Sequence, residues 1–266
     1  LSCEKFIISL KMQLDLTQGD IKHPMKTLAI PATIGFLFHT LYNVTDTYFA
    51  GQISTISLAA LSLSFPVFFI VIALGAGMSE ALTAQVGNAL GENQKEKAAH
   101  LAQNGLLFSL FLCIILTIFG TSIVPFLMQH LGAHGEYLNQ AVGYTNTIVM
   151  GTLLFVLTFF INGLLNSVGD MISFRNILIV SFFINIVLDY AFVKLGYGVN
   201  GIAYATLITE AISMLYLLYR LNKTSLLDNI KQFKIDLPQF WSLTTQGIPP
   251  SANMIFMSVG MYILTY

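Results

Sequence analysis

The sequence predicts an all-α fold, a polytopic bundle of membrane-spanning helices. Hydrophobic residues make up 55% of the chain and charged residues only 9%, whereas a soluble domain carries about 25% charged residues. Apolar runs of about twenty residues, the length that crosses a bilayer, recur along the sequence. These observations exclude an ordinary soluble domain.

Six complete apolar runs and a seventh that is still open at Tyr266 are interpreted as helices. Polar and charged segments bound them, among them the segment from Gly91 to Lys95 after the second run and the polar stretch after Arg220. The predicted helices cover residues 27–50, 56–78, 98–128, 141–161, 176–193 and 201–219, and the seventh begins near residue 241.

Lysine and arginine residues predict how these helices are oriented. The segments before the first helix and after the second, fourth and sixth contain every basic residue except Lys194, which lies in a loop on the opposite side. Basic residues favour the cytoplasmic side of a membrane. We therefore expect a multi-pass protein of the cytoplasmic membrane with its N-terminus in the cytoplasm.

A weak repeat predicts the domain organisation. Residues 29–33, at the start of the first helix, resemble residues 247–251, at the start of the seventh. Six helices return the chain to the same side, so the repeat is of the parallel kind and predicts a second half of similar length. The expected organisation is a six-helix lobe at 1–220, a cytoplasmic linker at 221–240 and the start of a second lobe at 241–266.

Two acidic residues inside apolar runs are the main indication of function. Asp46 lies late in the first helix and Asp189 late in the fifth. An aspartate at mid-membrane costs about 2.5 to 3.5 kcal/mol on insertion scales, so such residues usually serve an ion or proton pathway. Both helices run from inside to outside, which places the two carboxylates at similar depth and allows them to share one pocket. The competing interpretation is that both lie, hydrated, at the outer headgroup level.

Polar residues at helical spacing surround these acids. Desolvation penalises a charged carboxylate, so protonation near neutral pH becomes possible. Carboxylate, amide and hydroxyl oxygens are equally suitable for Na⁺, and the sequence leaves H⁺ and Na⁺ open. The candidate residues beside the two aspartates are Tyr42, Asn43 and His39 on the first helix, Asn185 on the fifth, and Thr206 and Glu210 on the sixth.

Enzymatic activity has no support in the sequence. There is no nucleophile elbow, phosphate-binding glycine loop or HExxH pattern. Cys3 and Cys113 are isolated, so they form no metal-binding spacing. No cofactor, transition-metal site or nucleic-acid partner is predicted; the lipid bilayer and a small molecule are the expected partners.

Five segments, in order and spacing, resemble the multidrug and toxic compound extrusion (MATE) transporters. They are residues 28–31 (LAIP), 46–51 (DTYFAG), 85–91 (QVGNALG), 166–170 (NSVGD) and 198–203 (GVNGIA). The resemblance covers about residues 20–266 and is greatest to the DNA-damage-inducible type of bacteria and archaea. It implies the N-terminal lobe of a twelve-helix, two-lobe transporter and the beginning of helix 7, with the rest of the C-terminal lobe missing from this chain.

The resemblance also implies an activity and a site. Members of the family export organic, often cationic compounds in exchange for H⁺ or Na⁺. The family's coupling site corresponds to Asp46, Tyr42 and the pair Asn185 and Asp189, and less closely to Thr206; a proline proposed to bend the first helix corresponds to Pro31. The glutamate that other branches carry on helix 7 is absent from residues 247–266, so any cation site must lie in the N-terminal lobe.

Two other functions are considered. A lipid-linked oligosaccharide or polysaccharide flippase of the same superfamily would need basic residues in its cavity to bind phosphate groups, and the predicted helices contain almost none. In a non-transporting membrane scaffold, Asp46 and Asp189 would only pair with polar neighbours.

Overall fold

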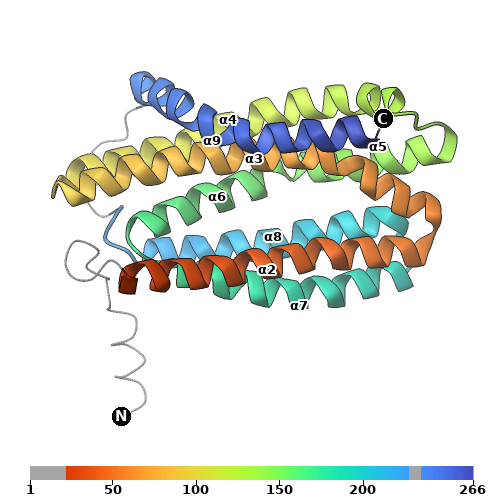
Figure 1. Cartoon of the computed structure of the whole chain (residues 1–266), viewed down its shortest axis with the longest axis horizontal. Helices are drawn as coiled ribbons and strands as arrows, with labels where there is room; N and C mark the ends of the chain where they lie inside the picture. Colours follow the sequence, from red (N-terminus) through yellow and green to blue (C-terminus); the bar gives the residue numbers. More distant parts are fainter. Residues whose placement is uncertain (1–21, 228–234, 266) are drawn as a thin grey trace, which may run out of the picture.

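The computed structural model describes residues 22–227 and 235–265, and these residues form helices and turns with no strand among them. Figure 1 shows eight helices running roughly along one long axis. They are α2 (Lys22–Ile53), α3 (Thr55–Gly91), α4 (Lys95–His130), α5 (Gly135–Met150), α6 (Thr152–Ser167), α7 (Ile172–Lys194), α8 (Gly198–Asn222) and α9 (Leu237–Thr265).

The helices are arranged in two layers joined by a bent pair. α2, α7 and α8 pack side by side as one layer, and α3 packs against α4 and α9 in the other (Figure 1). α5 and α6 contact both α3 and α8 and so connect the layers. Packing in this way places the buried faces of α2, α7 and α8 opposite α5 and α6, where the candidate site lies.

The all-α prediction is confirmed, and the helices are longer than the apolar runs suggested. By length and composition, α3, α4, α7 and α8 could each cross a membrane, and the pair α5 and α6 makes a fifth such span within the part of the chain described. α3 continues well past residue 78 to Gly91, with Glu80 exposed on it. Polar side chains of this extension contact neighbouring helices: the Ser79 hydroxyl donates to the Phe159 carbonyl on α6 and Gln85 Nε2 to the Ser242 hydroxyl on α9.

The prediction of one continuous helix at 141–161 is wrong. α5 ends at Met150 and α6 begins at Thr152, with a bend of 43° between them. Gly151 lies at the break, and a Cβ atom there would collide with the side chain of Leu207 on α8. The absence of a side chain therefore allows α8 to approach the bend closely. The Thr152 hydroxyl donates to the Val149 carbonyl at 2.6 Å, which satisfies an acceptor beside the break.

Short polar turns end the helices. The Ser54 hydroxyl accepts a hydrogen bond from the Ser57 backbone N–H at 3.0 Å, which caps α3. Gly169 between α6 and α7 and Gly196 between α7 and α8 have φ of 85° and 81°, a left-handed conformation that favours glycine. The tight connection at Gly196 returns α8 beside α7.

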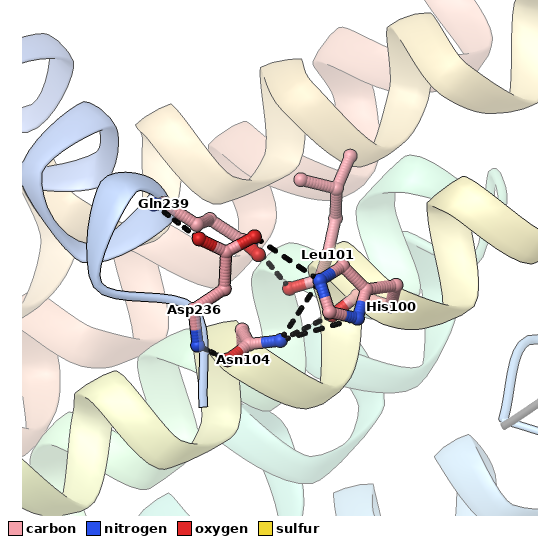
Figure 2. Close-up of polar contacts among 5 residues, drawn as sticks. All are labelled: His100, Leu101, Asn104, Asp236 and Gln239. Atoms are coloured by element: carbon pink, nitrogen blue, oxygen red, sulfur yellow. Dashed lines mark hydrogen bonds and ion pairs between the residues drawn. The ribbon is translucent and has the colours of Figure 1, made fainter. Parts of the chain in front are cut away.

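A polar cluster connects the start of α9 to α4 (Figure 2). His100 Nε2 lies 3.2 Å from Asp236 Oδ2, and the Asp236 backbone N–H donates to Asn104 Oδ1 at 2.9 Å. Asp236 Oδ1 also accepts from the Gln239 backbone N–H at 3.2 Å, as a helix N-cap does. Gln239 Nε2 in turn donates to the Leu101 carbonyl at 2.9 Å. The start of α9 is therefore fixed to α4 at three points.

Candidate functional site: a buried pair of aspartates beside a small cavity

A small cavity lined by polar and aromatic residues lies between the two layers. The cavity has a volume of about 60 Å³, and one water molecule needs about 10–15 Å³ of such a cavity. The cavity therefore has room for a few waters or ions but not for a drug-sized molecule, which needs about 300 Å³ or more. Its polar lining comprises His39, Tyr42, Asn43, Asp46, Ser64, Tyr144, Thr158, Ser181, Thr206, Glu210 and Ser213.

Asp46 is buried on α2, with 5% of its surface exposed. Its Oδ2 atom accepts a hydrogen bond from the Thr206 hydroxyl at 3.2 Å. Its Oδ1 atom has no hydrogen-bond partner among the residues described. The hydrated-surface interpretation of Asp46 is therefore inconsistent with the structure.

The Thr206 hydroxyl lies between two acceptors. Besides Asp46 Oδ2, the Ile202 carbonyl lies 3.0 Å from Thr206 Oγ1. A threonine hydroxyl has one hydrogen and can also accept. It can donate to Asp46 when that carboxylate is charged. When Asp46 carries a proton, Asp46 can donate to Thr206 while Thr206 donates to Ile202. Both protonation states of Asp46 can thus be accommodated without moving a helix.

Asp189 and Asn185 lie one turn apart on the buried face of α7, and both side chains are fully buried. They lie within interaction range of the Asp46 carboxyl group. Neither oxygen of Asp189, nor the oxygen or nitrogen of the Asn185 amide, has a partner of good geometry in the described part of the chain. The structure thus brings the three side chains together and leaves several of their polar atoms available for a ligand.

The other predicted residues on α2 occupy the same cavity. The Tyr42 hydroxyl lies 3.5 Å from the Thr206 carbonyl, to which it donates. Asn43 Nδ2 donates to the His39 carbonyl at 2.9 Å, so this amide is partly satisfied by its own helix. His39 and Asn43 both line the cavity. The side chain of Pro31 is outside those the structure describes, so helix bending at this residue stays a prediction.

Glu210 lines the cavity one helical turn beyond Thr206. It lies within interaction range of the Thr158 hydroxyl on α6. One turn further, the hydroxyls of Ser213 and Ser181 are 2.7 Å apart and link α8 to α7. The two predicted residues of this helix, Thr206 and Glu210, thus face the interior of the bundle rather than lipid.

Unpaired charge is costly at this site. A buried charge costs several kcal/mol unless it is paired, and two neighbouring carboxylates disfavour simultaneous ionisation. Among the residues that line the cavity there is no lysine or arginine. A proton or a small metal cation is therefore the simplest means of neutralising Asp46 and Asp189. No group of three His, Cys, Asp or Glu side chains suited to a metal converges within the described residues.

Sequence reasoning missed four residues that line the cavity. They are Ser64 on α3, Tyr144 on α5, Thr158 on α6 and Ser181 on α7. The one local signal at these residues is a hydroxyl group inside a predicted membrane span. Many hydroxyl-bearing residues in membrane helices show this signal, so it does not separate site residues from the others.

A bundle of membrane-length helices around a buried acidic cavity is the architecture of a multi-pass membrane transport protein. The sequence model of the MatE family matches residues 31–191. The chain belongs to this family, whose members are transporters rather than enzymes and need no cofactor.

Relatives and solved structures agree with this assignment. The chain is 26% identical over 251 residues to a probable multidrug resistance protein NorM of Thermotoga maritima, covering 91% of this chain and 53% of the relative. It is 24% identical to the multidrug export protein MepA of Staphylococcus haemolyticus, covering 94% and 57%. It is also 27% identical over 205 residues to an FAD transporter of Shewanella oneidensis, covering 75% and 45%.

Among solved structures, a crystal structure of a MATE protein in the bent conformation superposes with a TM-score of 0.88 at 31% identity, covering 96% of this chain and 58% of that one. An outward-facing MATE transporter of the MOP superfamily gives a TM-score of 0.87, also at 31% identity, covering 96% and 57%. The chain thus spans about half the length of the relatives it matches.

Proposed function

We propose that this chain forms the N-terminal lobe of a secondary antiporter that exports small organic, often cationic compounds in exchange for H⁺ or Na⁺. The expected organisation, a lobe at 1–220, a linker at 221–240 and the start of a second lobe at 241–266, belongs to this proposal. So does the location in the cytoplasmic membrane with the N-terminus inside. The finer assignment to the DNA-damage-inducible branch stays a prediction.

One observation carries the proposal: two buried, adjacent carboxylates that no basic side chain neutralises. Asp46 and Asp189 have between them three oxygens without a partner among the described residues. With the oxygens of Asn185 and Thr206 they form a compact set of hard ligands suited to Na⁺, or a proton can neutralise the pair. The names of the relatives, two of them multidrug proteins, favour an organic substrate.

The mechanism follows from the size and charge of the cavity. A cation on the pair removes the cost of the buried charge and stabilises the closely packed arrangement of α2, α7 and α8. Loss of the cation leaves an uncompensated charge, which favours an arrangement that admits water or a cationic substrate. One unit charge moving across 100 mV supplies about 2.3 kcal/mol, enough for a roughly fifty-fold concentration ratio.

Neither alternative is favoured. A flippase for phosphate-linked substrates would need basic residues, and none of the described cavity-lining residues is lysine or arginine. A scaffold without transport activity does not agree with membership of a family of transporters.

The test is substrate efflux from membrane vesicles that contain the product of the complete gene. The variants are Asp46→Asn and Asp189→Asn, and Glu80→Gln is the control because Glu80 is exposed on α3. We expect each aspartate variant to lose efflux driven by an ion gradient, while the control keeps it. Full activity in both aspartate variants would exclude the coupling role.

A further inference from the structure

The cavity contains a second acidic position, which differs chemically from the aspartate pair. Glu210 lies on α8 one turn after Thr206, about 6 Å further along the helix axis. Its side chain lines the same cavity as Asp46. The two acidic positions are therefore separated but reach one volume that can hold water.

The surroundings of Glu210 are poor in oxygen ligands. Around the aspartate pair, the Asn185 and Thr206 oxygens add to the carboxylates, but near Glu210 the neighbouring hydroxyl is that of Thr158. The Ser213 hydroxyl donates to the Thr209 carbonyl and the Ser181 hydroxyl donates to Ser213, so neither hydrogen is available to Glu210. The rest of the cavity wall is largely aromatic, formed by Phe38, Phe65, Phe68, Phe155, Phe159 and Phe174.

A hard metal cation needs several oxygen ligands, whereas a proton needs only one carboxylate oxygen. Thr158 is 4% exposed, and its hydroxyl has no partner of good geometry among the residues described. This hydroxyl can donate to a charged Glu210 and can accept from a protonated one. The local chemistry thus suits a proton and does not suit Na⁺.

Other titratable groups face Glu210 from the helices packed around α8. They are His39, Tyr42 and Asp46 on α2, Tyr144 on α5 and, behind Asp46, Asp189 on α7. Tyr42 lines the same cavity as Asp46 and Glu210 and interacts electrostatically with Asp46, Asp189 and Glu210. Hydrogen bonds through water in the cavity and through the Tyr42 hydroxyl can link Glu210 with the Asp46 and Asp189 carboxyl groups.

We infer that Glu210 is a second proton-binding site of this lobe, distinct from the Asp46 and Asp189 site and unable to hold Na⁺. This inference rests on the proposed transport function and adds a division of roles to it. The aspartate pair with Asn185 and Thr206 is the site open to either cation. Glu210, paired with Thr158, exchanges a proton with water on the side of the cavity nearer the carboxyl-terminal end of α8.

A labelling experiment tests the inference on the unmodified transporter. A hydrophobic carbodiimide reacts with protonated carboxyl groups in apolar surroundings, and mass spectrometry locates the modified residue. We expect labelling of Glu210 to fall about tenfold per pH unit once the carboxyl group is mostly ionised, and to be unaffected by added Na⁺. Labelling of Glu210 that stays constant as the pH rises, or protection of Glu210 by Na⁺ in a transporter whose aspartates are replaced by asparagine, would overturn it.

A transport experiment separates this inference from the proposed function. In proteoliposomes of the complete transporter, Glu210→Gln should slow efflux driven by a pH gradient by about fivefold or more, and Thr158→Val should slow it less. Glu80→Gln, on the exposed face of α3, is the matched control. Unchanged efflux with Glu210→Gln, while Asp46→Asn abolishes it, refutes the role of Glu210 only. Unchanged efflux with both refutes the proposed function as well.

Discussion

Replacing Thr206 with valine tests the hydrogen-bond arrangement at the aspartate pair. Valine keeps the shape of threonine and removes the hydroxyl that lies 3.2 Å from Asp46 Oδ2. A hydrogen bond to a charged group contributes about 1.5–3 kcal/mol and one between neutral groups about 0.5–1.5 kcal/mol. The substitution therefore destabilises charged Asp46 more than protonated Asp46, by about 1–1.5 kcal/mol.

The sign of this difference fixes the expected result. Because charged Asp46 loses more stabilisation than protonated Asp46, Asp46 of the variant binds its proton about tenfold more tightly. The pH at which efflux is half-maximal should therefore rise by about one unit. The assay is the initial rate of efflux from vesicles as a function of pH. Thr209→Val is the matched control, because Thr209 is a buried threonine on α8 whose hydroxyl donates to the Ala205 carbonyl at 2.8 Å. Identical pH profiles for the two variants would refute the reasoning.

Two further predictions concern the packing of α9. Gly77→Ala places a Cβ atom against the Ser251 backbone, 2.8 Å from its Cα, and should lower stability by about 1–3 kcal/mol, as measured by thermal unfolding. Gly87→Ala on the same helix meets nothing within 4 Å and should raise stability by up to about 1 kcal/mol. Asp236→Ala removes the cap on the Gln239 N–H and should cost about 0.5–2 kcal/mol, seen as faster hydrogen exchange in the first turn of α9. Asp236→Asn, which can still cap, should exchange nearly as slowly as the unmodified protein.

Most of the fold could be predicted from the sequence because few backbone structures are stable in a bilayer. Backbone groups in lipid must be paired within the segment, so long apolar runs become helices. The bend at Gly151 did not follow, because it depends on the close approach of Leu207 from a helix distant in the sequence. A glycine in an apolar run gives no such information by itself.

The candidate site was predictable in part for a similar reason. Asp46 and Asp189 are costly in a membrane and therefore conspicuous, and the alternating direction of the helices placed them at equal depth. In the structure Asp46 contacts Thr206, another of the predicted residues. Tyr144 and Thr158 are different, because only tertiary packing turns them toward the cavity. Nothing in their local sequence distinguishes them from hydroxyl groups that bond their own helix.

The most direct test of cation coupling is the release of cations when substrate binds to the purified complete transporter. A pH-sensitive dye in weakly buffered solution and a Na⁺ electrode detect the two candidate ions. We predict that substrate releases H⁺ or Na⁺ from the unmodified protein and that the double variant Asp46→Asn, Asp189→Asn still binds substrate but releases no more than the proton assigned to Glu210. Equal release from the two proteins would contradict the account.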